Sequence, residues 1–297
     1  MAYDDSRLNG LADTPEVEVV ARPATCHARR RWHLGMPQLD ACGLSETWLQ
    51  KTCGDRHWQA LAQLCDRAPQ AWTDGAGRRV YAAFCYLRLS EARLARPTEG
   101  QWLSVHSTTQ MTGRAQALSH HRLALGREAI GRLDLLSVFV GRADGVSNRS
   151  VQRVDLCATD AAESAEAARL KARVKAMRAE ALAREVPAGA PVMGLMPCPR
   201  SDYNGAGLLY FASFTALADR ALWQWGRLSA HDQIVDRECV FLGNLDIGES
   251  LCVALVDERS DGRTDALDLQ ITAAADGRVL VRMRLSVARG PRPPRAP

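Results

Sequence analysis

The segment from Asp202 to Trp223 constrains the fold of this chain more than any other stretch. It begins as a polar loop with Asn204, Gly205 and Gly207, and it continues as an apolar stretch with helical spacing. Apolar residues nearly surround the helix axis, which is typical of a helix that is buried on most sides. Glycines just before a buried helix leave its first backbone N–H groups free to meet a ligand oxygen. They also fit a plain turn with no ligand, so both interpretations stay open here.

A second helical segment precedes this one in the chain. Apolar residues recur at helical spacing from Leu44 to Cys65, where Ser45 is the expected N-cap and Glu46 lies in the first turn. Each helix is followed by four strand candidates. The candidates are residues 79–89, 101–111, 116–125, 133–140, 237–245, 250–257, 267–273 and 279–287. The repeat predicts two units side by side, each an antiparallel sheet wrapped around one buried helix.

This plan divides the chain into five parts. They are a flexible N-terminal arm (1–25), a first unit (26–150), a helical connector (151–190), a second unit (191–289) and a disordered tail (290–297). Residues 159–185 of the connector are dominated by Ala, Glu, Lys and Arg and contain no aromatic residue. That composition predicts a polar helix lying on the surface.

The composition bears on partners and location. A net charge of +4 is too small to indicate a nucleic-acid partner, and no apolar run is long enough to span a membrane. The N-terminus is polar and acidic rather than typical of a signal peptide, and the nine cysteines include no CxxC pair. These features predict a cytoplasmic protein with reduced thiols. The seven histidines form no metal-ligand spacing with Cys, Asp or Glu, so no metal site is predicted.

Particular segments resemble a known enzyme family. Asn204–Phe214 and Glu238–Asp246 resemble the bifunctional acyltransferase/decarboxylase family of leinamycin-type polyketide biosynthesis. Gly54–Trp58 and Tyr81–Leu89 are looser matches in the first half, and the connector does not match. The resemblance implies an α+β double hot-dog fold, in which two antiparallel sheets each wrap around a long central helix in one chain.

The resemblance also implies chemistry on acyl thioesters. Members of this family decarboxylate methylmalonyl-CoA and transfer the propionyl group to the phosphopantetheine of an acyl carrier protein, without a metal or an organic cofactor. The implied partners are therefore acyl-CoA and an acyl carrier protein, and the chain is expected to be a monomeric pseudo-dimer or a homodimer. A tyrosine in the N-terminal half is regarded as the key residue of the family. Tyr86 is the best match here, and a shift of one position would place Cys85 there instead.

The expected chemistry selects candidate residues. Decarboxylation of a malonyl thioester leaves an enolate, whose oxygen is well stabilised by fixed backbone N–H groups. The loops before the two helices could supply these groups, so the predicted substrate-binding residues include Gly43, Leu44, Ser45, Gly205, Ala206 and Gly207. Asn244 is a further predicted substrate-binding residue, because its turn between two strand candidates could adjoin the pocket in a wrapped sheet, although the turn also fits a purely structural role. The predicted catalytic residues are Tyr86, Tyr81, Asn204 and His33. Tyr81 and Tyr86 are an odd number of residues apart on one strand, so we expect them to face opposite sides and at most one to line a given pocket.

Two other functions stay open from the sequence. A dehydratase or thioesterase with the same fold would recruit a histidine or an acidic base, for which His33, His57 and Asp55 are the candidates. A non-catalytic protein could use the fold only to bind a carrier protein. For each candidate a structural role is the alternative, because Tyr86 also fits a core position and Asn204 a turn.

Overall fold

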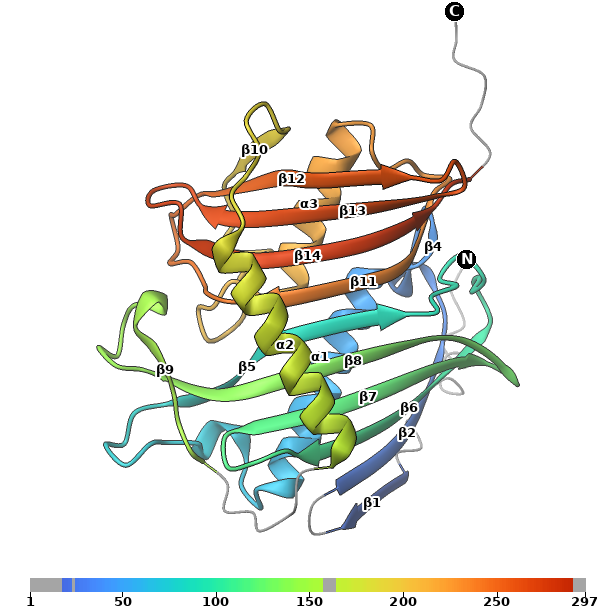
Figure 1. Cartoon of the computed structure of the whole chain (residues 1–297). Coiled ribbons are helices and arrows are strands. Elements are labelled where there is room, and N and C mark those ends of the chain that lie inside the picture. The colour runs from blue at the N-terminus through green and yellow to red at the C-terminus, as the bar shows by residue number, and fades with distance from the viewer. Residues whose placement is uncertain (1–17, 23–24, 157–163, 291–297) are drawn as a thin grey trace, which may run out of the picture.

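The computed structural model describes residues 18–22, 25–156 and 164–290 (Figure 1). The predicted tail, apart from residue 290, and most of the predicted N-terminal arm lie outside this part of the chain. The last residues of the arm form strand β1 (Glu18–Arg22), which pairs with β2. The described residues form one antiparallel sheet of 12 strands, with two central helices against one face.

The two halves of the sheet repeat one plan. The first unit contains β2 (Thr25–His33), β3 (Leu39–Asp40), β4 (Gly43–Leu44), α1 (Glu46–Leu64), β5 (Val80–Ser90), β6 (Trp102–Met111), β7 (Gln116–Leu125), β8 (Glu128–Arg142) and β9 (Val151–Arg153). The second contains β10 (Val192–Leu195), α3 (Phe211–Gln224), β11 (Gln233–Phe241), β12 (Leu251–Ser260), β13 (Thr264–Ala273) and β14 (Val279–Ala288). The strand order β2-β6-β7-β8-β5 in the first unit is matched by β10-β12-β13-β14-β11 in the second, so β5 and β11 meet at the centre.

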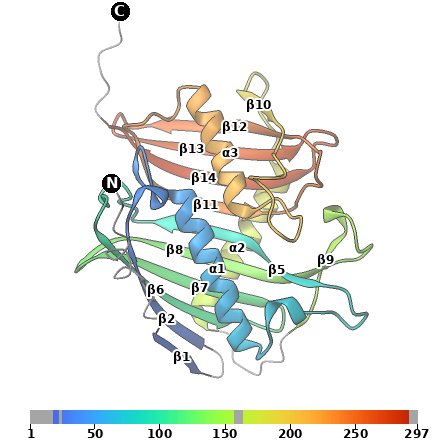
Figure 2. The ribbon, with the colours of Figure 1, turned by 180° about the vertical axis from the view of Figure 1, so that it is seen from behind.

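The helices divide the sheet into two faces. Helices α1 and α3 lie against the face that we call inner, and α2 (Ala165–Ala183) crosses the opposite, outer face (Figures 1 and 2). Met177 of α2 is buried with Tyr86 and Leu136 of the sheet, and Arg173 forms an ion pair with Glu238 of β11. The connector is therefore fixed to the outer face across the junction of the two units.

One apolar core runs beneath both central helices. Leu49 and Cys53 of α1 share it with Phe214 and Leu217 of α3. The fully buried Arg237 of β11 ties the two helices together, because its guanidinium lies 2.8 Å from Glu46 of α1 and 2.8 Å from Asp219 of α3. A buried arginine needs such partners to offset its lost hydration.

An irregularity in β5 changes which face its tyrosines occupy. Phe84 pairs with Ser137 and Tyr86 with Leu136, so Cys85 is an extra residue that forms a β-bulge. Tyr81 pairs with Val140 on the same stretch of β8 as Leu136. Tyr81 and Tyr86 therefore both point to the outer face, and the expectation of opposite faces was wrong because strict alternation fails at a bulge.

Candidate active site

The candidate active site is a cavity where β5 and β11 separate. These strands pair only from Leu89 with Arg237 to Tyr86 with Val240, and beyond that point they diverge. The gap holds a cavity of about 1140 Å³ that is lined from both faces of the sheet. We call the part beside α1 and the start of α3 the inner part, and the part beside α2 the outer part.

The inner part is aromatic and lies where the two central helices approach each other. The rings of Phe84 and Phe211 have centroids 4.4 Å apart, and those of Tyr210 and Phe211 are 4.8 Å apart. A Cβ atom on Gly54 of α1 would lie 3.0 Å from the Phe211 ring and 3.0 Å from the Tyr210 hydroxyl. A glycine at this position therefore allows the close approach of α1 to the start of α3.

Helix α3 begins at this cavity without a cap. Its N-cap residue is Tyr210, which makes no side-chain cap hydrogen bond, and its first turn has no acidic residue. In the described part of the chain, the N–H groups of Phe211 and Ala212 have no acceptor. The positive end of the helix dipole is thus uncompensated beside an apolar cavity, as suits a ligand oxygen that carries negative charge.

Two ionisable groups accompany the start of α3. Asp55 of α1 lines the cavity, and one of its carboxylate oxygens accepts a hydrogen bond from Gln59 at 2.7 Å. Burial, followed by the negative charge of Asp55, raises the pKa of Tyr210 above its usual range. The Tyr210 phenol is therefore a neutral hydrogen-bond donor at physiological pH.

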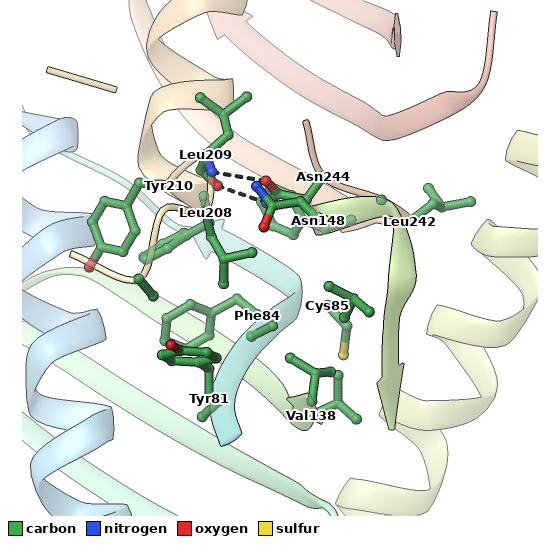
Figure 3. A pocket seen from close by; sticks show the side chains of 18 of the residues that line it. Tyr81, Phe84, Cys85, Val138, Asn148, Leu208, Leu209, Tyr210, Leu242 and Asn244 are labelled. Atoms are coloured by element: carbon green, nitrogen blue, oxygen red, sulfur yellow. Dashed lines mark hydrogen bonds between the residues drawn. The ribbon is translucent and has the colours of Figure 1, made fainter. Parts of the chain in front are cut away.

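Three asparagines hold the loop that leads into α3. Asn204 Oδ1 accepts from the N–H groups of Ala206 and Leu208 at 3.0 and 3.1 Å. Asn244 accepts from Leu209 N–H at 2.9 Å and donates to its carbonyl at 3.0 Å (Figure 3). Asn148 donates from Nδ2 to the carbonyl oxygens of Gly207 and Leu245, both at 2.7 Å. These amides position the loop through its own backbone.

The outer part of the cavity combines apolar and cationic side chains, and we call its cationic residues the rim. Cys85 and Val138 lie near each other in the lining (Figure 3), and burial raises the pKa of the Cys85 thiol to about 12, so it stays protonated. Tyr81 is flanked by the guanidinium carbons of Arg79 and Arg142, at 5.7 and 5.5 Å from its ring centroid. The cationic residues that line the cavity are Arg79, Arg149, Arg153, Lys171, Lys175, Arg178 and Arg278. Asp55 is the single acidic residue among the described residues of the lining.

The structure places five of the predicted site residues at the cavity. They are Tyr81, Asn204, Gly205, Ala206 and Asn244. Gly207 lies next to them, with a positive φ of 70° and its carbonyl bonded to Asn148. The loop before α3 therefore belongs to the cavity, as the first interpretation of its glycines requires.

The other predicted residues lie elsewhere. The hydroxyl of Tyr86 donates to Glu238 at 2.7 Å beneath α2, and Tyr86 itself still pairs with Val240, so it lies before the point where β5 and β11 separate. His33 is exposed, with its ring 5.0 Å from that of Trp102. The residues Gly43, Leu44 and Ser45 are covered by the segment around Leu94, whose carbonyl accepts from Leu44 N–H at 2.7 Å.

The alternative candidate His57 is a buried structural residue. Its ring nitrogens lie 2.8 Å from Ser119 Oγ and 2.7 Å from Ser137 Oγ, and Ser119 also contacts His121 at 3.0 Å. Burial lowers the pKa of His57 to about 3, and the pKa of His121 is likewise about 3. Both imidazoles are neutral under physiological conditions, and neither lines the cavity.

Sequence reasoning missed Tyr210, Asn148 and the cations of α2. Tyr210 stands directly before an apolar helix, and Lys171, Lys175 and Arg178 recur at intervals of four and three residues, so a signal existed in each case. Within the described ranges no group of three His, Cys, Asp or Glu side chains could hold a metal ion. In the same ranges no helix is long and apolar enough to cross a membrane.

Comparison with known proteins gives structural likeness without sequence similarity. No protein-family model and no curated protein matches the chain. The 12:0-ACP thioesterase from Umbellularia californica superimposes with a TM-score of 0.61 at 13% identity, covering 89% of this chain and 98% of that one. An oleoyl thioesterase (putative) from Lactobacillus plantarum gives 0.62 at 7% identity, covering 90% and 97%. An acyl-ACP thioesterase from Bacteroides thetaiotaomicron gives 0.56 at 12% identity, covering 88% and 97%. The chain has the double hot-dog fold, as the sequence predicted.

Proposed function

We propose that this chain is an enzyme that hydrolyses acyl thioesters of CoA or of an acyl carrier protein. The observation that carries the proposal is the pairing of Asp55 on α1 with the uncapped start of α3, across an aromatic cavity. Its charged rim suits a phosphate-bearing carrier, and its aromatic inner part suits an acyl chain. The three thioesterases with the same fold support this class of substrate by likeness of fold.

Groups that line the cavity can serve each step of the hydrolysis. The thioester carbonyl oxygen lies against the first N–H groups of α3, which stabilise the negative charge of the tetrahedral intermediate. Asp55 takes a proton from the water that attacks the carbonyl carbon. The C–S bond then breaks, and the thiolate leaves with a proton donated through Asp55. Tyr210, kept neutral beside Asp55, supplies a phenolic O–H that can donate a hydrogen bond to the reacting thioester.

Decarboxylation with acyl transfer is the second candidate. The segment Asn204–Phe214, which carries the resemblance to the acyltransferase/decarboxylase family, forms the loop and first turn of α3 at the cavity. The same N–H groups would stabilise an enolate, and Tyr210 would return a proton to it. Against this candidate, the negative charge of Asp55 would repel a malonyl carboxylate in the inner part. Tyr86, the best match to the family tyrosine, also lies outside the cavity.

Product analysis distinguishes the two reactions. The chain is incubated with acyl-CoA of graded chain length and with malonyl- and methylmalonyl-CoA, each with and without an acyl carrier protein. Mass spectrometry should detect free carboxylic acid and free thiol. Loss of carbon dioxide with an acylated carrier protein would instead support the second candidate. Binding of thioesters without any turnover would contradict both reactions and favour a non-catalytic carrier-binding protein.

The role of Asp55 is tested by Asp55→Asn. Loss of a general base should lower kcat by about 100-fold or more, since such groups contribute 10²–10⁴-fold. Glu99→Gln is the matched control, because Glu99 is an exposed acid that does not line the cavity. Full kcat in Asp55→Asn would rule out its role as the base, provided that the control is equally active.

A further inference from the structure

We infer that α2 binds the phosphate end of the carrier, so that the thioester enters from the outer face and its pantetheine arm passes between β5 and β11. The inference rests on the proposed thioester chemistry and adds the direction of entry and the residues that hold the carrier. It also gives the connector helix a role in binding, although its composition predicted only a surface helix.

One face of α2 presents three cations to the cavity. Lys171, Lys175 and Arg178 line it together with Val174, at spacings that place them on one side of the helix. Like charges three or four residues apart on a helix repel each other and destabilise it. Lys171 donates to the carbonyl of Thr112. Lys175 and Arg178 are exposed and have no acidic partner among the described residues, so their charge remains available to an anion.

The other face of α2 is firmly attached to the sheet. Met177 is buried, and ion pairs join Arg173 to Glu238 and Glu180 to Arg284. The cations of the cavity face are therefore presented from a rigid support, which reduces the entropy lost when they bind a ligand.

The charges opposite α2 are more fully compensated. Arg149 forms ion pairs with Glu249 and Asp276, and Arg153 lies 3.6 Å from Asp155. Lys175 and Arg178 differ from Arg149 and Arg153 in having no acidic partner among the described residues. A phosphate is the ligand group that such a Lys and Arg pair recognises through charge-assisted hydrogen bonds.

The gap between the strands leads from these cations to α3. Cys85 of β5 and Leu242, which follows β11, line the cavity on its outer side, while Phe84 and Phe211 line it on the inner side. Gly205 also lines the cavity and has no neighbouring atom within 4 Å of the position that a Cβ would take. A slender pantetheine arm fits this route, with its phosphate on α2 and its thioester at the start of α3.

The test compares two double variants with the same change in net charge. Lys175→Ser/Arg178→Ser removes the two cations of the cavity face. Arg169→Ser/Arg127→Ser is the matched control, because Arg169 on α2 and Arg127 after β7 are exposed and do not line the cavity. Calorimetry with CoA, 3′-dephospho-CoA and pantetheine measures binding, and kinetics with acyl-CoA, acyl-carrier protein and acyl-pantetheine measures KM and kcat.

The cavity-face variant should bind CoA about tenfold or more weakly than the control, because it lacks the two cations that form charge-assisted hydrogen bonds to phosphate. Its KM for acyl-CoA should rise by the same factor at unchanged kcat, while values for acyl-pantetheine, which lacks phosphate, should not change. Dephospho-CoA and the carrier protein show whether the 3′-phosphate or the phosphate joined to pantetheine makes the contact.

Failure of the inference can be told apart from failure of the proposed function. Equal CoA binding by the two variants would overturn the inference even if the protein hydrolyses thioesters. An equal rise in KM for acyl-CoA and acyl-pantetheine would also overturn it. If no thioester is turned over but CoA binding still depends on Lys175 and Arg178, the binding role of α2 stands and the hydrolytic function falls.

Discussion

The two central helices hold equivalent places in the two hot-dog units, yet they begin in opposite ways. Ser45 caps α1 by accepting from Trp48 N–H at 3.4 Å, and Glu46 lies in its first turn. Helix α3 begins at Tyr210 with neither a side-chain cap nor an acid. The positive end of α1 is therefore compensated, whereas that of α3 stays available at the cavity. The two helix starts thus differ: that of α1 is closed by groups of the chain itself, whereas that of α3 opens onto the cavity.

The buried residues of the two helices also differ in polarity. Helix α1 buries Gln50, Arg56 and His57, while α3 buries mainly apolar residues such as Phe214 and Leu217. Buried polar groups hold α1 in one position through specific hydrogen bonds, because leaving any of them unpaired is costly. Helix α1 then acts as a fixed wall that presents Gly54 and Asp55 to the start of α3.

Close packing covers the start of α1. A Cβ atom on Gly43 would lie 2.2 Å from the carbonyl oxygen of Leu94, so the segment around Leu94 is pressed directly against this loop. Glu46 is in turn bound by Arg237. The place in the first unit that corresponds to the start of α3 is therefore filled by the chain itself.

The largest effect that we predict is a loss of folding stability at acidic pH, caused by the buried histidines that hold α1 in place. His57 and His121 have pKa values of about 3 in the fold, against 6.5 for an unperturbed imidazole. Between these values the unfolded chain binds protons that the folded chain does not, so the free energy of unfolding falls as the pH drops from 6.5 toward 3. The two residues together should account for several kcal/mol, at 1.36 kcal/mol per unit of pKa. Urea denaturation at pH 7 and pH 4.5 measures this loss.

Substitution of the buried histidine should flatten the pH dependence. His57→Gln should be less stable at pH 7 and lose less stability on acidification than the unmodified chain. His231→Gln serves as the control, because His231 is exposed. Parallel pH profiles for His57→Gln and the control would show that burial of the imidazole does not anchor α1.

The next effect concerns the contact between the two helices. Gly54→Val should place methyl groups against Phe211 and Tyr210, since even a Cβ would lie 3.0 Å from each. We expect kcat/KM to fall by about 100-fold or more, because small displacements of reacting groups cost this much. Thermal unfolding should confirm that the variant is folded.

A matched glycine distinguishes this effect from a general loss of stability. Gly75→Val adds the same atoms where no neighbour lies within 4 Å of the Cβ position, and it should keep full activity. Gly54→Ala should fall between the two. If Gly54→Val turned over substrate as fast as Gly75→Val, the inner part of the cavity would not be where the reaction occurs.

The fold could be predicted because its signals are local. The apolar spacing of residues 208–222 fixes a buried helix, and the repeated pattern of strands fixes the second unit around it. The cap of α1 at Ser45 was also predicted and is confirmed, since it depends only on residues within one turn. Such features need no knowledge of distant parts of the chain.

The site could be predicted only in part because it depends on distant pairing. The bulge at Cys85 arises from the register of β5 on β8 and turns Tyr86 to the outer face beneath α2, where its pairing with Val240 keeps it outside the gap. The segment around Leu94 covers Gly43–Ser45, although the two segments are about 50 residues apart in the sequence. Local sequence patterns do not show such a contact. The charges of α2 were visible in the sequence, but their place at the cavity follows from where the connector crosses the sheet.

The smallest effect that we predict follows from removing the N-cap of α1, which should lower stability without changing kcat/KM. Ser45→Ala should lower the free energy of unfolding by about 1 kcal/mol, the usual cost of a lost N-cap, and the melting temperature by about 2 °C. Ser164→Ala removes the corresponding cap of α2 and controls for cap loss as such, because Ser164 accepts from Ala167 N–H at 3.2 Å. Calorimetry gives the stability, and initial rates at 25 °C, well below unfolding, give kcat/KM. Since the start of α1 is closed off by Leu94, kcat/KM should be the same in Ser45→Ala as in the unmodified chain. A fall in kcat/KM larger than that of Ser164→Ala would mean that the first unit also contributes to the reaction, and the division of roles between the two helix starts would be wrong.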